Sequence, residues 1–389
     1  MLAATITILA VIIIFIYIFP EFHRSPPGPL NLPLLGSLTK IDQKVPTLTF
    51  IKLKQKYGPI YNVKLGLTNI VVISDATLLK DILLRHDCLP RPPCHIFNKI
   101  FHNKGISYTT HDPWKNQHKF IANFIKTSKV LLENQIQKSA AEFVQNVQTQ
   151  GLRVPLHTVE VITRYVVDIM GTVCLGIFNY DDALIKTLSH SFNQLLSGAS
   201  TLITTTSIQW NLLYRAQHQE VQNQVRQELH DVLHGKTLHI DDLSKLSYTQ
   251  ATVAEVDTIR TLLPLGFPRY TSQNMVFLNY TIPASTMIVP LLWGIHMDPG
   301  VWKMPEEFRP GRFLNDAGHF FQPESFLAYQ AGERMCVGKD LANIMVVFFV
   351  ATVVQNFKIE GLESGSVDLS YEWSFLTLPK PQELVFVQL

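Results

Sequence analysis

The sequence is organised around one stretch, Tyr329-Gln-Ala-Gly-Glu-Arg-Met-Cys-Val-Gly338, in which a single cysteine lies between two glycines. An apolar segment, residues 341–354, follows at once and is predicted to form a helix. Cys336 therefore precedes a helix N-terminus, where the helix dipole and backbone amides are expected to lower the pKa of a thiol. The glycines are expected to let the backbone approach a flat ligand. Arg334 is a fork-shaped donor suited to a carboxylate.

One interpretation of this stretch is a turn with a buried free cysteine before a core helix. The pattern aromatic-x-x-Gly-x-Arg-x-Cys-x-Gly, however, resembles the cysteine-ligand loop of the cytochrome P450 family. Its fixed positions here are Tyr329, Gly332, Arg334, Cys336 and Gly338. The resemblance implies that Cys336 is the axial thiolate ligand of a haem b iron and that Arg334 contacts a haem propionate. A thiolate ligand favours O–O cleavage and so suits monooxygenation.

Composition limits the class of protein. A chain of 389 residues can bury a large core. The net charge of +2 and the lack of a basic tract give no case for a nucleic-acid partner. The four cysteines are Cys88, Cys94, Cys174 and Cys336. Because none has CxxC spacing, they argue against a disulfide scaffold or a structural zinc site and fit a reducing compartment.

The N-terminal residues 1–20 are predicted to be a transmembrane anchor, since they are apolar and no charge precedes Glu21. A cleaved signal peptide is the alternative, although a basic start and a small-residue cleavage site are missing. Residues 21–45 are predicted to form a proline-rich hinge that holds the body off the bilayer. Microsomal members of the family begin in this way. The resemblance therefore implies that residues 46–389 face the cytosol at the endoplasmic reticulum membrane, near membrane lipid.

The resemblance implies a mainly α protein with small β-sheets, and the apolar periodicity predicts where its helices and strands lie. Helices are predicted at residues 46–58, 76–86, 112–126, 129–149, 157–175, 195–213, 218–234, 247–263 and 341–354. Strands are predicted at 60–65 and 69–74, as two short strands within 275–289, and as a terminal hairpin within 357–389. The resemblance implies the cytochrome P450 fold with an N-terminal membrane helix.

Two further positions resemble propionate contacts of the family. Trp114-Lys-Asn-Gln-His118 stands where the family has W-x-x-x-R, and the histidine is charged only partly near neutral pH. A core tryptophan is the alternative for Trp114. Arg269, directly after a proline, is the other candidate, with a surface arginine as its alternative.

A buried ion pair is implied by a second pair of motifs. Glu255-Val-Asp-Thr258 resembles the family's E-x-x-R, and Pro310-Gly-Arg-Phe313 resembles P-x-R-F. Glu255 and Arg312 are thus expected to pair, while Thr258 replaces the first arginine. Since a buried carboxylate without its fork partner is costly, either Arg312 compensates alone or the loop is looser. Arg260 lies about 140° round the helix from Glu255 and cannot substitute.

The predicted central helix would cross above the haem and carry the family's acid–alcohol pair, which relays protons to bound oxygen. Alignment by Gly198 or by Trp210 gives two registers, roughly 200° apart, that cannot both face the haem. The acid and alcohol are then Ser200 and Thr201, or Leu202 and Ile203. We prefer the first register, because Gly198 and Thr201 share one helix face. Ser200 can relay protons only through ordered water, and a Ser/Thr-rich core helix is the alternative for Thr201.

The family's F and G helices, which roof the substrate pocket, have no counterpart near residues 185–196. About a hundred residues normally lie at this point. The chain is therefore either an incomplete or spliced gene product, or a protein with an open distal face and a large exposed apolar surface.

The reaction that the resemblance implies is NADPH- and O2-dependent hydroxylation of a small lipophilic, steroid-like substrate. The stretches 293–302 and 333–338 resemble animal microsomal members, including the insect ecdysteroid hydroxylases. Electrons would come from a flavoprotein NADPH reductase that meets Lys115, Lys119 and Lys339. The alternatives are a catalytically degenerate haem-binding membrane protein and a truncated, unstable product.

Overall fold

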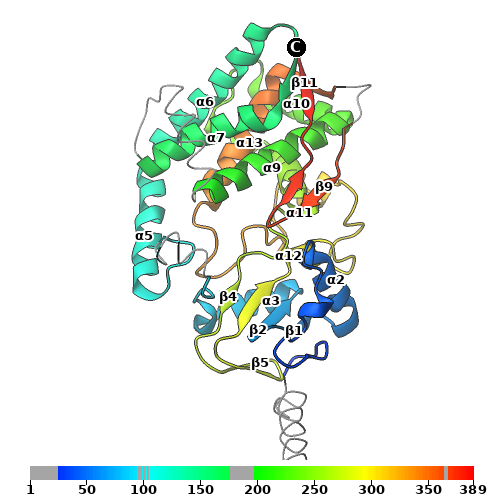
Figure 1. The fold of residues 1–389 in the computed structure, drawn as a ribbon. Helices are drawn as coiled ribbons and strands as arrows, with labels where there is room; N and C mark the ends of the chain where they lie inside the picture. The colour runs from blue at the N-terminus through cyan, green and yellow to red at the C-terminus, as the bar shows by residue number, and fades with distance from the viewer. Residues whose placement is uncertain (1–24, 95–98, 100–101, 103–104, 176–196, 363–366) are drawn as a thin grey trace, which may run out of the picture.

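The computed structural model describes residues 25–94, 99, 102, 105–175, 197–362 and 367–389. The predicted membrane anchor and the predicted gap near 185–196 lie outside these residues. The described chain is mainly helical. Figure 1 shows a helix-rich part that contains the C-terminus and a sheet-containing part in which the described chain begins.

The helix-rich part surrounds one apolar helix, α13 (Lys339–Asn356). Around it lie α6 (Lys129–Gln150), α7 (Thr158–Leu175), α9 (Ser197–Gln217), α10 (Gln219–Leu233) and α11 (Ser247–Ile259). Ten of the eighteen residues of α13 are buried, so it is apolar on most sides because it forms the core. Among the described residues it is also the one helix long and apolar enough to cross a membrane, with 56% of that window buried.

The sheet-containing part is built on four strands in the order β1-β2-β7-β4. They are β1 (Ile60–Leu65), β2 (Thr68–Ile73), β7 (Met287–Pro290) and β4 (Arg269–Tyr270). The predicted hairpin β1–β2 is confirmed, and β2 pairs in parallel with β7 from far along the chain. Two helices accompany the sheet, α2 (Pro46–Tyr57) and α3 (Ala76–Leu83).

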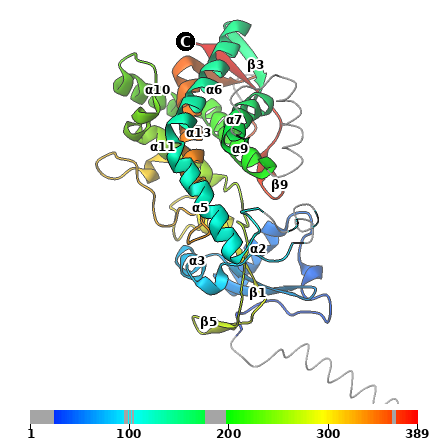
Figure 2. The ribbon, with the colours of Figure 1, turned by 90° about the vertical axis from the view of Figure 1, so that its left-hand side faces the viewer.

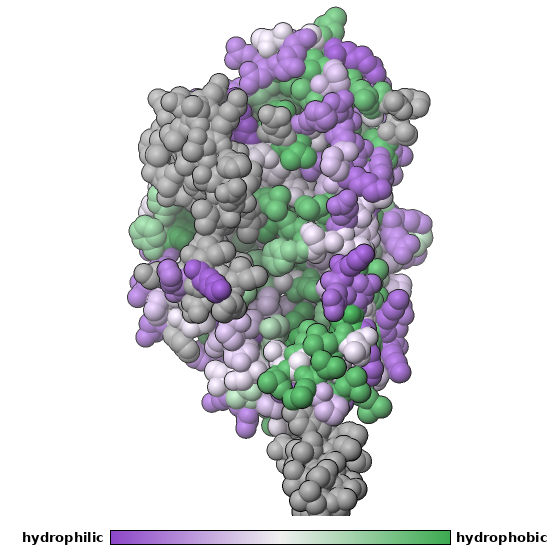
Figure 3. Space-filling view, viewed as in Figure 1, coloured by the Kyte–Doolittle hydropathy of each residue, from purple (hydrophilic) through white to green (hydrophobic). Residues whose placement is uncertain are grey.

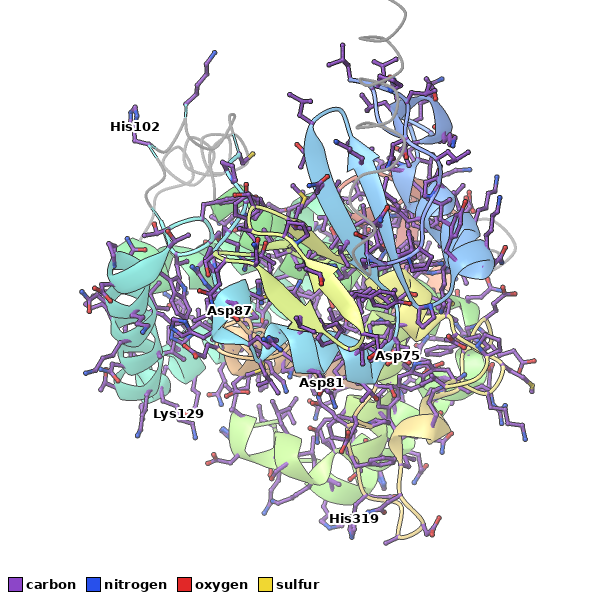
Figure 4. The ribbon with its side chains drawn as sticks, turned by 90° about the horizontal axis from the view of Figure 1, so that it is seen from below. Asp75, Asp81, Asp87, His102, Lys129 and His319 are labelled. Carbon is purple, nitrogen blue, oxygen red and sulfur yellow. The ribbon has the colours of Figure 1, made fainter. Side chains whose placement is uncertain are left out.

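The helix α3 begins at a clear cap. The Asp75 carboxylate accepts a hydrogen bond from the Leu78 amide at 2.9 Å, which satisfies one of the free amides of the first turn. Figure 4 shows Asp75, Asp81 and Asp87 spaced along this segment. The short 3₁₀-helix η2 (His86–Cys88) follows and leads toward the cysteine loop.

Three smaller sheets complete the fold. β3 (Arg153–His157), β11 (Glu383–Gln388) and β8 (Phe357–Gly361) form one, β9 (Tyr371–Trp373) and β10 (Thr377–Pro379) a second, and β5 (Met275–Phe277) and β6 (Tyr280–Ile282) a third. The predicted terminal hairpin is confirmed in β9–β10, and β8 and β11 pair antiparallel around it. Residues 275–290 hold three strands instead of two.

The remaining elements are one α-helix between the two parts, one short helix after β7 and three 3₁₀-helices. They are α5 (His111–Thr127), α12 (Leu292–His296) and the 3₁₀-helices η1 (Leu38–Lys40), η3 (Ile240–Lys245) and η4 (Pro310–Phe313). Figure 2 shows α5 and α6 following one another from the sheet-containing part to the helix-rich part.

Most predicted helices are confirmed within one to three residues. The helix α11 ends four residues before the predicted 263, because Thr261 adopts a φ of 26° and Pro264 disfavours helical geometry before it.

The described part of the proline-rich stretch is not a free spacer. The Asn62 amide donates to the Pro27 carbonyl at 2.8 Å, and the Asn62 side chain donates to the Pro26 carbonyl at 2.6 Å. A Cβ added at Gly28 would lie 2.2 Å from the Asn62 carbonyl oxygen, so only glycine fits this approach. Residues 26–28 of the expected stand-off hinge are thus packed against β1.

Candidate functional site

The cysteine loop is a tight backbone structure that ends at α13. The Cys336 amide donates to the Tyr329 carbonyl at 3.2 Å, and the Lys339 amide donates to the Cys336 carbonyl at 3.3 Å. Gly338 is the N-cap residue of α13, so Cys336 lies two residues before the cap. The Tyr329 hydroxyl donates to the Asn343 side chain at 2.8 Å, which fixes the start of the loop to the same helix.

The expected low pKa of the cysteine is wrong for the protein alone. Cys336 is accessible to solvent, yet the protein packed around it raises the pKa of its thiol, and the opposing effect of the Gly338 amide is smaller. The position before a helix is therefore not enough to ionise the sulfur. A metal ion bound to the sulfur supplies the positive charge that does so, because a coordinating thiol loses its proton outright.

The two glycines of the cysteine loop have different surroundings, so glycine is needed at each position for a different reason. Gly332 adopts a φ of 75°, and a Cβ there would lie 2.3 Å from the Leu83 carbonyl oxygen at the end of α3. Its expected role beside a flat ligand is thus replaced by close approach to another backbone segment. At Gly338 the nearest atom to an added Cβ is the Cys336 sulfur at 4.0 Å. A side chain at Gly338 would therefore lie beside the sulfur.

Arg334 joins the loop to the segment before α5. Its guanidinium lies 3.9 Å from the centre of the Trp114 ring. It donates to the carbonyls of Leu89, Ile106 and Thr109 at 3.1, 3.3 and 2.7 Å. Trp114 is thus a buried stacking partner of the arginine that precedes the cysteine.

The replacement of arginine by histidine at position 118 lowers the positive charge of the site. The His118 ring lies 5.2 Å from the Trp114 ring. Burial and the nearby Arg334 both lower the pKa of His118, so its imidazole is neutral near pH 7. It therefore offers one N–H where the family pattern has a permanent cation.

Two further arginines converge on Arg334. Arg269 is fully buried, which excludes the surface alternative, and donates to the Arg334 carbonyl at 3.3 Å. The backbone carbonyls of Ser107, Phe267 and Pro268 accept from Arg91 at 3.0, 3.1 and 2.7 Å. Burial, then Arg269 and Arg334, lower the pKa of Arg91. No motif predicts Arg91, and its only signal in the sequence is an arginine within Pro90-Arg-Pro-Pro93.

This arginine cluster (Arg91, Arg269 and Arg334) suits an anionic ligand. Within the described residues, none of the three forms an ion pair with a carboxylate, and the buried Arg269 Nε has no hydrogen-bond partner. Buried cations that repel one another are costly unless an anion joins them. Haem b carries two carboxylates and an iron ion, so the cluster and Cys336 fit its propionates and its metal.

The predicted Glu255–Arg312 pair is formed. The Arg312 Nε lies 2.9 Å from the Glu255 carboxylate, although these two atoms do not have hydrogen-bond alignment. The Arg309 amide donates to the same carboxylate at 2.8 Å. Burial nevertheless raises the pKa of Glu255 to about 7. Arg312 therefore compensates for Thr258 only in part, and the Thr258 hydroxyl bonds back to the Ala254 carbonyl at 2.9 Å.

A neighbouring carboxyl group, Asp257, was not singled out from the sequence. It is buried between α11 and α9, and its Oδ1 accepts a hydrogen bond from the Ser207 hydroxyl at 3.0 Å. Burial raises its pKa to about 7, with the Ser207 bond acting in the opposite direction.

Arg260 contacts aromatic rings and not Glu255. Its guanidinium carbon lies 4.9 Å from the Trp210 ring centre and 5.1 Å from those of Tyr214 and Tyr371. The prediction that it does not substitute for the missing arginine is confirmed. The Arg260 guanidinium instead makes cation–π contacts with both α9 and the C-terminal strand β9.

The side chains that the two candidate registers select on the central helix differ in their exposure to solvent. The side chain of Ser200 lies outside the described residues. Thr201 is 1% exposed and its hydroxyl has no hydrogen-bond partner among the described residues, whereas Leu202 is 42% exposed. The alignment by Gly198 therefore places a buried side chain at the proposed proton relay, and the alignment by Trp210 places an exposed one. The relay itself remains a prediction.

A cysteine at the start of a core helix, with an arginine cluster and a stacked tryptophan beside it, defines a site of the haem-thiolate class. The sequence profile of the family described as cytochrome P450 matches residues 26–203 and 188–386. The chain belongs to the cytochrome P450 family.

Two of the curated relatives described here match nearly the whole chain, and a third matches part of it. Cytochrome P450 2K4 of Oncorhynchus mykiss is 24% identical over 465 aligned residues, with 94% of this chain and 92% of the relative covered. Cytochrome P450 2D6 of Homo sapiens is 24% identical over 495, with 99% of each covered. Cytochrome P450 2U1 of Homo sapiens is 38% identical over 160 residues, with 41% of this chain and 29% of the relative covered.

The first two of these alignments are longer than the chain. The 495 aligned positions exceed the 389 residues by 106, so at least that many positions of the relative have no counterpart here. Proteins of this family are monooxygenases that bind haem b and take electrons from NADPH through a reductase.

Proposed function

We propose that this protein is a haem-thiolate monooxygenase that hydroxylates a small lipophilic, steroid-like substrate at the endoplasmic reticulum membrane, with its catalytic body in the cytosol. The observation that carries the proposal is the convergence of the arginine cluster and Trp114 beside Cys336. In this arrangement Cys336 would ligate the iron, and Arg91, Arg269 and Arg334 would hold the two propionates.

The residues of the site would balance the charge of the cofactor and hold it in position. The guanidinium groups neutralise the propionates and fix the orientation of the cofactor. Gly338 leaves the cysteine sulfur accessible, and Trp114 covers one face of Arg334. When bound, haem b supplies the iron at which oxygen is activated for insertion into the substrate.

The partners in the proposal are membrane lipid, a lipophilic substrate and a flavoprotein NADPH reductase. Lys115 and Lys119 are exposed on α5, and Lys339 begins α13 directly after the cysteine loop. These lysines would meet acidic residues of the reductase. The relatives contain positions that have no counterpart here, which supports the proposal that the helices covering the substrate pocket are missing. The proposed position of this missing segment is near residues 185–196.

The test is the reduced carbon-monoxide difference spectrum of membranes that contain the full chain, beside the Cys336→Ser variant. We expect the red-shifted band of thiolate ligation in the parent chain and its loss in Cys336→Ser. An unchanged band in the variant would overturn the assignment of Cys336. The absence of any haem band in the parent would favour the truncated, unstable product.

A second function is a catalytically degenerate haem-binding membrane protein. The imperfectly aligned Glu255–Arg312 pair and Thr258 favour it, because they weaken the support of the cysteine loop. A chain that shows the thiolate band but consumes no NADPH with reductase and a panel of steroids would select this function.

A further inference from the structure

His296 is a buried histidine at the end of α12, and both of its ring nitrogens have partners. Polar side chains usually face water, and Figure 3 shows hydrophilic residues along one side of the helix-rich part. His296, in contrast, has an exposed fraction of 0%. Its Nδ1 lies 2.8 Å from the Thr261 hydroxyl oxygen, and its Nε2 lies 3.1 Å from the Leu327 amide nitrogen. These two contacts offset the cost of burying an imidazole.

The partners of His296 assign the proton of the ring to Nδ1. A backbone amide can only donate, so the Leu327 amide requires Nε2 to be the acceptor. The Thr261 hydroxyl donates its own hydrogen to the Thr258 carbonyl at 2.7 Å, which leaves its oxygen to accept from Nδ1. Burial lowers the pKa of His296 to about 3, so the imidazole is neutral at neutral pH and Nε2 stays an acceptor.

These hydrogen bonds connect α11 to the segment that leads into the cysteine loop. They run from the Thr258 carbonyl through the Thr261 hydroxyl and the His296 ring to the Leu327 amide. Thr258 is the position at which the arginine of the family's E-x-x-R motif is replaced. The connection therefore begins where a cation is missing, and it consists of neutral groups.

The backbone of Leu327 determines how the cysteine loop begins. Its carbonyl accepts a hydrogen bond from the Gln330 amide at 2.8 Å, in a turn where Gln330 has a φ of 61°. Tyr329 lies within this turn, and its carbonyl accepts from the Cys336 amide at 3.2 Å. Because His296 binds the amide of Leu327 and the turn binds its carbonyl, a shift of His296 would move the backbone that holds Cys336.

Two aromatic side chains limit the movement of the His296 ring. The Phe326 ring lies nearly parallel to it, with 6.2 Å between the ring centres and 15° between the planes. The Trp302 ring meets it edge-on, at 6.3 Å and 88°. Phe326 directly precedes Leu327, so the parallel ring and the bound amide belong to the same segment. The imidazole is thus held in one plane with its Nε2 facing the Leu327 amide.

We infer that His296 is a positioning residue for the haem-binding cysteine, because through the Leu327 amide it holds the cysteine loop in the conformation in which Cys336 can ligate iron. The inference rests on the haem-thiolate function proposed above and adds a residue that acts on the ligand through another backbone segment. It also gives the loop a support from α11 although Thr258 replaces the arginine. In the alternative, His296 only fills space in the core, and its shape alone would matter.

Three substitutions separate the roles of the two ring nitrogens. His296→Gln places an amide oxygen near the position of Nε2 and keeps an acceptor for the Leu327 amide. His296→Asn places an N–H near the position of Nδ1 and keeps only the donor to Thr261. His296→Phe keeps a ring but has neither group. The matched control is His230→Gln at an exposed position of α10, and far-ultraviolet circular dichroism checks the helix content of every variant.

Hydrogen–deuterium exchange of residues 326–336 and the reduced carbon-monoxide spectrum are measured on the full chain. In His296→Asn and His296→Phe the Leu327 amide has lost its acceptor, and we expect it to exchange at least about tenfold faster than in the parent. The same two variants should show less of the red-shifted thiolate band and more of the neutral-thiol band. His296→Gln and His230→Gln should match the parent in both measurements.

The other outcomes overturn the inference. If His296→Phe behaves as the parent does, His296 only fills space. If His296→Gln loses the thiolate band together with the other two variants, the bond to the Leu327 amide is not what holds the loop. If exchange becomes faster while the thiolate band is unchanged, His296 holds the segment without positioning the cysteine.

Failure of the proposed function gives a different result. A parent chain without a haem band contradicts the haem-thiolate function and the role of the loop as a ligand, whereas unchanged exchange in His296→Phe overturns the inference on its own. If His296→Phe does not fold, the comparison of His296→Asn with His296→Gln still decides, because each keeps one of the two hydrogen bonds.

Discussion

Among the residues that the structure describes, no cation forms an ion pair with the buried acid Asp257, and its neutralisation should stabilise the protein above neutral pH. The carboxyl lies between α9 and α11, and Ser207 is its hydrogen-bond donor. Its pKa is raised from 3.8 to about 7 by burial. The neutral form is therefore favoured in the folded state, and the stability it contributes is fully present below pH 4 and is lost as the pH rises through 7.

The size of this loss follows from the pKa difference. A rise from 3.8 to about 7 corresponds to about 4 kcal/mol of unfolding free energy once the carboxyl has ionised. Asp257→Asn keeps the shape and can still accept the Ser207 hydrogen bond, but carries no charge. We expect it to be more stable than the parent by about 2–4 kcal/mol at pH 8 and equal to it near pH 4.

The assay is urea unfolding followed by circular dichroism at pH 4, 6 and 8. Ser207→Ala is the opposing control, because it removes the donor to the carboxylate and should cost about 1–3 kcal/mol at pH 8 but little at pH 4. The reasoning would be refuted if the difference in unfolding free energy between the parent and Asp257→Asn were the same at every pH. Such a result would mean that water or an unrecognised cation solvates the carboxylate.

Further variants test the support of the cofactor. Arg91→Gln should raise the rate of haem loss to a haem scavenger by about tenfold, since one cation of the cluster is removed, whereas Arg226→Gln on α10 should leave it unchanged. Thr258→Arg should give Glu255 a second cation, lower its pKa and raise the unfolding free energy at pH 8 by about 1–3 kcal/mol. An equal gain in Thr258→Met would show that size and not charge was missing. His118→Arg should slow haem loss at pH 8, where the histidine is neutral, and an identical rate would exclude position 118 from propionate binding.

Local patterns in the sequence predicted the parts of the site that depend on neighbours along the chain. The helices followed from apolar periodicity, and the cysteine loop and the Glu255–Arg312 pair followed from motifs with fixed spacing. Arg91 could not be found in this way, because it lies in an irregular proline-rich segment and meets Arg269 only through tertiary packing.

Packing also explains the wrong predictions. The pKa of Cys336 depends on how much protein surrounds the sulfur, and this is not encoded by its position before a helix. The need for glycine at position 332 comes from the carbonyl of Leu83, which no spacing rule connects to the loop. The parallel pairing of β2 with β7 is likewise invisible to a pattern confined to one segment.

The hydrogen bonds of Arg334 set an order of events during synthesis. Its partners Leu89 and Thr109 lie 245 and 225 residues earlier in the chain. A ribosome therefore releases nearly all of the protein before the last arginine of the cluster and the cysteine can reach their places. Until then the site contains Arg91 and Arg269 but lacks Arg334 and Cys336. Binding of haem is therefore expected to be among the last steps in the folding of a newly made chain.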